Sequence, residues 1–168
     1  GLGNRRRLLA DLEFAASERE AMLALFDLDG FKTYNDAFGH QAGDVLLERL
    51  GRRLAAAVGD VGRAYRLGGD EFCVLLRGER RAAAMQAAIA ALREHGEAFT
   101  IGASYGTVAF DEEPVSAEEA MRLADARMYA QKNSGRVPAG TQSKDVLLRA
   151  LAERYPDLEH HLDGVTHL

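Results

Sequence analysis

Cysteine is nearly absent from the sequence: Cys73 is the only one among 168 residues, and it lies inside an apolar run. A disulfide within the chain is therefore excluded, and the composition is typical of a cytoplasmic protein. Long hydrophobic runs are also missing, because none approaches the roughly 18 to 20 residues that span a membrane. We therefore expect no direct membrane contact by this segment. There is no signal-peptide pattern either.

Positive charge is scarce, with 21 Lys and Arg residues against 26 Asp and Glu residues and a net charge of −5. A general nucleic-acid binder would show a basic face, so nucleic acid is not an expected partner. An acidic protein that binds a polyphosphate must supply cations locally, through a metal or a few placed Lys and Arg side chains. Repeats and low-complexity segments are absent as well. The length suits one domain with a buried core and a short appendage.

Hydrophobic periodicity predicts an α+β fold, with a sheet on which helices pack. Helices are expected at residues 4–20, 31–58 with a break at 38–40, 80–95 and 116–132, where Ser116 and Glu119 form a capping-box pattern. Strands are expected at residues 21–28, 61–67 and 72–76, with a strand or hairpin at 99–110 bent at Gly102 and Gly106. Leu46, Leu50, Leu54 and Val58 form one apolar stripe on the long helix.

The two runs at 61–67 and 72–76 flank Gly68-Gly69-Asp70-Glu71, which predicts a hairpin turn with two adjacent carboxylates. Glycines without a Cβ leave room for a phosphate, and hard cations prefer carboxylate oxygens. Taken alone, such a turn is more often only a solvated acidic loop. Asp27 changes this balance, because it ends a buried strand that would lie beside the hairpin. Three carboxylates that converge without a lysine between them are costly unless a cation is bound.

Other polar residues extend this arrangement. Asp29 is expected to cap the helix that follows, whereas Asp27 comes too early for a cap. The candidate phosphate-binding residues are Lys32, Lys132 and Arg136. Asn35 and Asp44 flank the helix break, and an amide with a carboxylate can read guanine, whose ring N–H and exocyclic amine are donors. The set is suited to one or two Mg²⁺ ions that hold a triphosphate for attack by a hydroxyl.

Three motifs in this order resemble the GGDEF family of diguanylate cyclases. They are Asp27-Leu-Asp-Gly-Phe-Lys32-Thr-Tyr-Asn35-Asp-Ala-Phe-Gly-His40-Gln-Ala-Gly-Asp44, Arg66-Leu-Gly-Gly-Asp-Glu-Phe72 and Ala124-Asp-Ala-Arg-Met-Tyr129-Ala-Gln-Lys132-Asn-Ser-Gly-Arg136. The resemblance covers residues 1–138, and Leu2-Gly-Asn4-Arg5-Arg6 is similar to the end of the family's opening motif. We therefore expect the chain to begin inside that motif and to come from a longer protein with an upstream sensory domain. The resemblance implies a palm-like fold of the nucleotide-cyclase or ferredoxin-like type, with a central, mainly antiparallel sheet and flanking helices.

The resemblance also implies a reaction and a set of site residues. Two GTP molecules would be condensed into cyclic di-GMP with release of pyrophosphate, with Mg²⁺ or Mn²⁺ as cofactor, by a transient or regulated homodimer. The implied metal ligands are Asp27, the Leu28 carbonyl, Asp70 and Glu71, and the implied catalytic residues are Asp70, Glu71 and Lys32. The implied substrate-binding residues are Phe31, Asn35, His40, Asp44, Gly68, Gly69, Lys132 and Arg136.

One departure from the family pattern concerns regulation. Many members carry an Arg-x-x-Asp site for product inhibition, and here its charged positions are Gly59 and Gly62. We expect inhibition through that site to be absent. The alternative function is a GTP-binding regulatory module that controls an attached domain, although such modules often lose the acids that are kept here. A relaxed cyclase that also uses ATP is disfavoured by Asp44.

Residues 139–168 are predicted to be a linker and a helical tail beyond the cyclase pattern. The stretch from Leu147 to Val165 resembles the lead-in to a metal-dependent HD-type phosphohydrolase domain. The alternative is a helical tail that packs on the cyclase or on a second copy of it. His160, His161, Asp163 and His167 are interpreted as part of a surface helix rather than as a metal site.

Overall fold

The computed structural model describes residues 2–18 and 21–134. The helices are α1 (Arg5–Glu18), α2 (Phe31–Phe38), α3 (His40–Val58), the short 3-10 helix η1 (Gly59–Val61), α4 (Arg81–Ala91) and α5 (Ala117–Ser134). The strands are β1 (Ala21–Asp29), β2 (Gly62–Gly68), β3 (Glu71–Arg77), β4 (Glu94–Gly96) and β5 (Phe99–Ala109). Arg136 and the predicted linker and tail at 139–168 lie outside the described residues.

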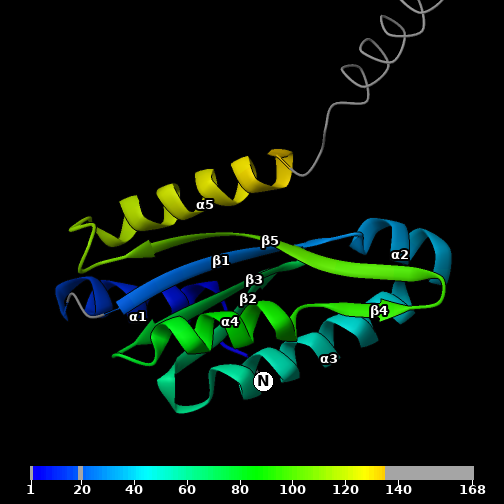
Figure 1. Cartoon of the computed structure of the whole chain (residues 1–168), viewed down its shortest axis with the longest axis horizontal. Helices are drawn as coiled ribbons and strands as arrows, with labels where there is room; N and C mark the ends of the chain where they lie inside the picture. The colour runs from blue at the N-terminus through cyan, green and yellow to red at the C-terminus, as the bar shows by residue number, and fades with distance from the viewer. Residues whose placement is uncertain (1, 19–20, 135–168) are drawn as a thin grey trace, which may run out of the picture. The chain divides into compact units, whose positions relative to one another are not determined.

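The strands form one antiparallel sheet in the order β2-β3-β1-β5-β4 (Figure 1). The central strand, β1, pairs with β3 on one side and with β5 on the other. The predicted α+β fold with a mainly antiparallel sheet and flanking helices is therefore confirmed. The predicted hairpin is formed by β2 and β3, and β3 lies inside the sheet as its two apolar faces indicated.

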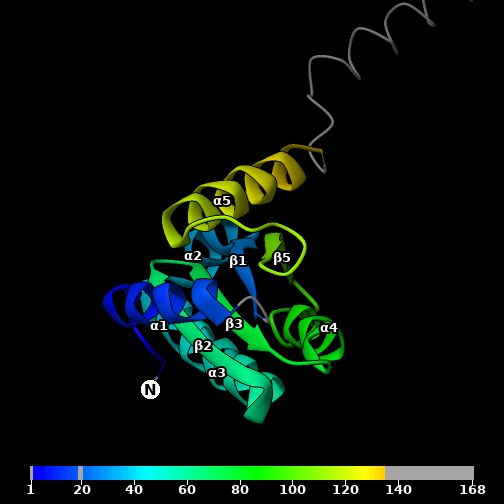
Figure 2. The ribbon, with the colours of Figure 1, turned by 90° about the vertical axis from the view of Figure 1, so that its left-hand side faces the viewer.

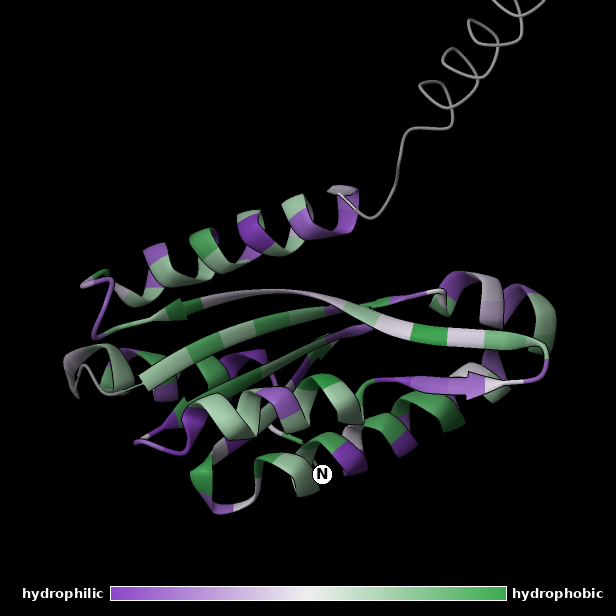
Figure 3. Cartoon of the chain, viewed as in Figure 1, coloured by the Kyte–Doolittle hydropathy of each residue, from purple (hydrophilic) through white to green (hydrophobic). Residues whose placement is uncertain are grey.

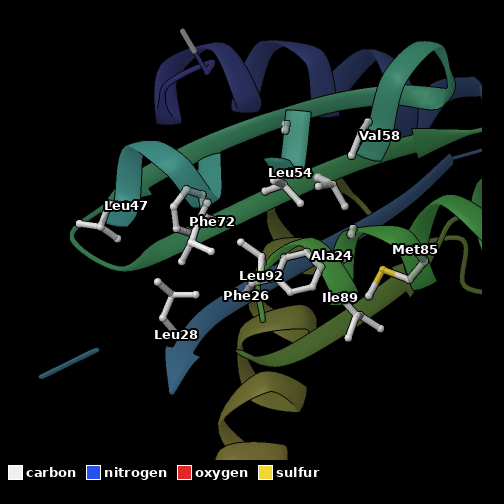
Figure 4. Close-up of a cluster of buried hydrophobic side chains, with 14 of the residues drawn as sticks. Ala24, Phe26, Leu28, Leu47, Leu54, Val58, Phe72, Met85, Ile89 and Leu92 are labelled. Carbon is white, nitrogen blue, oxygen red and sulfur yellow. The ribbon is translucent and has the colours of Figure 1, made fainter. Parts of the chain in front are cut away.

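Helices cover both faces of the sheet, with α5 on the face opposite α3 and α4 (Figures 1 and 2). Because successive side chains of a strand point to opposite faces, β1 contributes Phe26 and Leu28 to a core beneath α3 and α4, and Leu23 and Leu25 to a second core beneath α1 and α5. Figure 4 shows side chains of the first core pointing toward one another from β1, β3, α3 and α4. A strand that is buried on both faces is apolar along most of its length. In Figure 3, much of β1 has the green colour of hydrophobic residues.

Two local predictions about helices are confirmed. The stripe of Leu46, Leu50, Leu54 and Val58 on α3 is fully or almost fully buried. At the start of α5, the backbone N–H of Glu119 donates a hydrogen bond of 3.2 Å to the Ser116 hydroxyl oxygen, which satisfies one of the unpaired amides of the first turn.

Two local predictions are wrong. The helix predicted over 80–95 ends at Ala91, and residues 94–96 form β4, which pairs with β5. Asp29 does not cap α2, whose N-cap is Gly30 with φ of 84° and no side-chain cap. By contrast, the prediction of a strand or hairpin at 99–110 is confirmed in its first form, because residues 99–109 form one continuous strand. A Cβ at Gly106 would collide with the backbone of α5, so this glycine allows the helix to approach the strand closely.

Candidate active site

The sheet register brings Asp27 and Glu71 together. They are direct cross-strand partners on β1 and β3, and such side chains share one face with Cβ atoms about 4.5 to 5.5 Å apart. That face is the one covered by α1 and α5, because Asp27 follows Leu23 and Leu25 of the second core at two-residue spacing and therefore points to the same side of β1. Asp27 is mostly buried at the strand end, whereas Glu71 is exposed.

The turn between β2 and β3, Gly68-Gly69-Asp70-Glu71, is called the signature turn below. Gly68 has φ of 158° and Gly69 has φ of 49°, conformations that glycine adopts more easily than other residues. A register shift between Arg66 and Gly68 interrupts the regular pairing of β2 with β3 just before the turn. The Leu28 N–H donates a hydrogen bond of 3.2 Å to the Asp70 carbonyl oxygen, which attaches the turn to β1.

Two contacts of this site had no signal in the sequence. The Arg66 guanidinium donates hydrogen bonds of 3.1 Å and 2.8 Å, from Nε and Nη2, to the Gly69 carbonyl oxygen. The buried Ser104 hydroxyl on β5 donates to both carboxylate oxygens of Asp29, at 3.0 Å and 2.9 Å. A lone Arg before a turn and a lone Ser in a strand are common, so only the sheet register shows what they contact.

Lys132 forms an ion pair with Asp27, and both side chains are largely buried, with 26% and 18% of their surface exposed. The prediction that the carboxylates converge without a lysine between them is therefore wrong. Lys132 reaches the strand end because α5 lies directly on β5. The Tyr105 N–H donates to the Gln131 side chain at 2.5 Å, and Arg127 donates to the Thr107 carbonyl at 2.7 Å.

The charges at the strand ends shift the acidity of the turn. Burial raises the pKa of Asp70, and the neighbouring negative charge of Asp27 raises it further. A backbone hydrogen bond and the positive charges of Lys132 and Arg66 oppose this rise, but they do not cancel it. Asp70 therefore carries its negative charge at a cost, which a nearby divalent cation would relieve.

The donor set fits a divalent cation that is shared with a ligand. Within residues 2–18 and 21–134, no three His, Cys, Asp or Glu side chains converge into a complete metal centre. Mg²⁺ commonly uses only one or two protein carboxylates and takes its remaining oxygens from water and substrate phosphates. Asp27 and Glu71 supply such a pair, and the ammonium of Lys132 shows that a cation is accommodated beside Asp27.

The corner between α2 and α3 holds the predicted base-reading residues. The Asn35 Oδ1 atom is buried and has no hydrogen-bond partner in the described part of the chain. It lies against Gly43, where a Cβ would collide with it, and Phe31 is buried at the same place. Asp44 follows Gly43 on α3 and is exposed. The corner thus holds a buried, unpaired acceptor next to an exposed carboxylate.

The other predicted residues make no contact with the carboxylates that the structure describes. Lys32 and His40 are exposed, and neither makes an ion pair within the described ranges. The glycines of the signature turn have open space around their Cβ positions, so a ligand can approach the backbone there.

A cavity of about 300 Å³ lies beside Glu71, on the face covered by α5. A larger cavity of about 800 Å³ lies between α1 and the start of β2, away from the carboxylates. None of the helices in the described residues is long and apolar enough to cross a membrane.

The chain is similar to several known proteins. Residues 1–138 match the family described as "Diguanylate cyclase, GGDEF domain". The diguanylate cyclase DgcS of Shewanella oneidensis is 33% identical over 144 residues, which cover 81% of this chain and 49% of DgcS. The chain therefore spans about half the length of this relative.

Solved structures show the same architecture. A sensory box/GGDEF family protein from Caulobacter crescentus is 35% identical, with a TM-score of 0.67, over 80% of this chain and 95% of that one. The coiled coil and GGDEF domain of DgcB from the same organism, solved in complex with c-di-GMP, is 26% identical, with a TM-score of 0.66, over 80% of this chain and 78% of that one. The chain has the signature turn and the paired carboxylates, and its residues 1–138 match the family. It therefore belongs to the GGDEF-domain family of diguanylate cyclases.

Proposed function

We propose that the chain condenses two GTP molecules into cyclic di-GMP, with release of pyrophosphate and with Mg²⁺ or Mn²⁺ as cofactor. The observation that carries this proposal is the cross-strand pair of Asp27 and Glu71 at a glycine turn, with a cation already placed beside Asp27. Paired carboxylates can hold a divalent metal, and such a metal binds the oxygens of a triphosphate. An uncharged substrate would not need this arrangement.

Each group of residues has a separate task in this proposal. Asp27, the Leu28 carbonyl, Asp70 and Glu71 would hold the metal, which would neutralise charge on the phosphates. Lys132 and Lys32 would contact phosphate oxygens, with Arg136 outside the described residues in the same role. Gly68 and Gly69 would let the triphosphate approach the turn backbone.

The chemistry needs two such sites. The 3′-hydroxyl oxygen of one GTP attacks the α-phosphorus of the other; a P–O bond forms, the bond to pyrophosphate breaks, and the hydroxyl proton is released. The same step in the opposite direction closes the ring. Two domains that meet face to face would provide this alignment, so most of the rate gain comes from positioning and from charge neutralisation. A transient homodimer and an upstream sensory domain that controls it belong to the same proposal.

Base selection is assigned to the α2–α3 corner. The Asn35 Oδ1 atom is unpaired but buried against Gly43, so it would have to turn outward to accept a hydrogen bond from the base, whereas the exposed carboxylate of Asp44 can accept directly. Guanine offers donors at its ring N–H and exocyclic amine, whereas adenine presents an acceptor at the ring nitrogen. His40 and Phe31 complete this part of the proposed substrate site.

Product feedback is absent in this proposal. The positions of the family's inhibitory pair are Gly59, the first residue of η1, and Gly62, the first residue of β2, and neither supplies charge. The cyclase should therefore keep working as cyclic di-GMP accumulates.

The test is incubation of the chain with GTP and Mg²⁺, with identification of the nucleotide products by chromatography and mass spectrometry. Cyclic di-GMP and pyrophosphate in a one-to-two ratio are expected, at a rate that rises with the square of protein concentration when the dimer is weak. GTP binding without any product would contradict the proposal and favour the GTP-binding regulatory module. Asp70→Asn serves as the matched inactive variant.

A further inference from the structure

Arg66 makes the contact in the hairpin that the proposed chemistry has not used. It lies on β2, three residues before Gly69, and its guanidinium donates two hydrogen bonds to the Gly69 carbonyl oxygen at 3.1 Å and 2.8 Å. A guanidinium is a rigid, planar donor, so two bonds to one oxygen fix the direction of that carbonyl more firmly than one bond from a flexible side chain.

The next carbonyl of the turn is fixed from the other side. The Asp70 carbonyl oxygen accepts the 3.2 Å hydrogen bond from the Leu28 N–H of β1. Two consecutive peptide groups are thus held in place: the one between Gly69 and Asp70, and the one between Asp70 and Glu71. Without the Arg66 contact, the peptide after Gly69 would be held only through the conformation of two glycines, whose backbone is the most permissive in proteins.

Arg66 is itself held by the segment that precedes α1. The Arg66 N–H donates to the Gly3 carbonyl at 2.9 Å, and the Gly3 N–H donates to the Ala64 carbonyl at 3.3 Å. This short parallel bridge covers the outer edge of β2 at Tyr65. Gly3 is required there, since a Cβ would lie 2.5 Å from the Tyr65 ring atom Cδ1. The base of the Arg66 side chain is therefore anchored.

We propose that Arg66 is a positioning residue, which acts through the Gly69 carbonyl to hold the signature turn so that Asp70 and Glu71 present their carboxylates toward the end of β1. It does so without contacting substrate. The predicted effects on kcat and KM rest on the proposed cyclase function. The predicted effect on the rigidity of the turn in the unliganded protein does not.

The experiment compares Arg66→Ala and Arg66→Lys with the parent, using the full chain. The matched control is Arg63→Ala, because Arg63 lies on the same strand and is half exposed, but its ion pair is with Asp11 on α1 at 3.1 Å. The readouts are backbone amide hydrogen exchange at residues 68–71, thermal unfolding, and kcat and KM for GTP.

In Arg66→Ala, amide exchange at residues 68–71 should become faster by about tenfold or more, while the rest of β3 keeps its protection. The value of kcat should fall by about 10- to 100-fold, because small displacements of catalytic groups are costly. The KM for GTP should change by less than about threefold, since the base-reading corner is untouched. Arg66→Lys should recover less than half of the lost kcat, because an ammonium lacks the guanidinium fork. Arg63→Ala should leave turn exchange and kcat unchanged.

Unchanged exchange at the turn in Arg66→Ala would overturn the inference, whether or not the chain makes cyclic di-GMP. A KM effect larger than the kcat effect would also overturn it, since that pattern belongs to a residue that binds substrate directly. Full recovery by lysine would show that charge alone matters and would reject the positioning role. If the parent makes no product, the proposed function fails by itself, and the exchange measurement still decides the role of Arg66.

Discussion

Lys132 near the end of α5 and Asp27 near the end of β1 form an ion pair across 105 positions of the chain. The pair is largely buried, so water screens it only in part and each charge depends on the other for compensation. In the free protein, the lysine ammonium thus lies where the proposed function requires positive charge. Removing it should affect metal and nucleotide in opposite directions.

Lys132→Ala should bind Mn²⁺ more tightly than the parent in the absence of nucleotide, by about 3- to 30-fold, because a competing positive charge near Asp27 is lost. The same variant should bind a non-reactive GTP analogue more weakly, since a proposed phosphate contact is missing. Isothermal titration measures both affinities. Lys132→Arg is the control and should keep the metal affinity close to that of the parent. Weaker Mn²⁺ binding by Lys132→Ala would mean that the lysine does not compete for this position.

Asp70→Asn should make the metal-free fold slightly more stable at pH 7, by about 1 to 4 °C in Tm. The folded-state pKa of Asp70 is raised, first by burial and then by the charge of Asp27, so the ionised carboxylate destabilises the folded state. This destabilisation is absent below the ordinary value of 3.8 and grows as the pH rises through the raised pKa. The difference between variant and parent should therefore vanish near pH 3. A lower Tm for Asp70→Asn at pH 7 would contradict this sign.

Loss of cyclic di-GMP synthesis should accompany that gain in stability. Asp70→Asn and Glu71→Gln remove metal charge at a turn whose backbone stays in place, so turnover should fall by about a thousandfold or more while the circular dichroism spectrum is kept. Product formation by either variant is followed by chromatography. Near-normal turnover would remove the metal-site interpretation of the pair.

Asp44→Ser should relax base selection. A hydroxyl can donate or accept, so the ratio of kcat/KM for GTP to that for ATP should fall by about 10- to 100-fold. Asp36→Ser is the matched control, because Asp36 is an exposed carboxylate on the neighbouring α2. It should leave the ratio unchanged. A ratio that stays constant in Asp44→Ser would show that another residue discriminates between the bases.

Cyclic di-GMP should not inhibit the parent at low micromolar concentration, which a product titration measures. Restoring the family's charged pair should also be costly, since a Cβ at Gly62 would collide with the Leu75 carbonyl on β3. Gly62→Asp should therefore lower the free energy of unfolding by about 1 to 3 kcal/mol, as overpacking does. At Gly59 a Cβ would meet open space, but φ is 54°, a conformation that side chains rarely adopt, so Gly59→Arg should lower the stability through backbone strain. Potent noncompetitive inhibition of the parent by cyclic di-GMP would contradict the prediction that product inhibition is absent.

Local patterns in the sequence predicted most of the elements. The stripe from Leu46 to Val58, the Ser116 cap and the glycine turn between two apolar runs are short-range features, whose energies depend on residues within a few positions. The three-residue β4 was missed because Glu94-His95-Gly96 has no strand pattern of its own and exists through its pairing with β5. Asp29 was misjudged because its partner, Ser104, is 75 positions away.

The sequence by itself determined the family, the two-faced central strand and the carboxylates at the strand ends, because each of these is written in contiguous residues. Only the tertiary structure decided that Lys132 lies beside Asp27, since that contact depends on how closely α5 approaches β5 over Gly106. It also decided that Arg66 holds Gly69, a contact made across the register shift between Arg66 and Gly68. The physical reason is that side-chain partners are chosen by distance in space, and sheet register and helix docking fix that distance only after distant segments have come together.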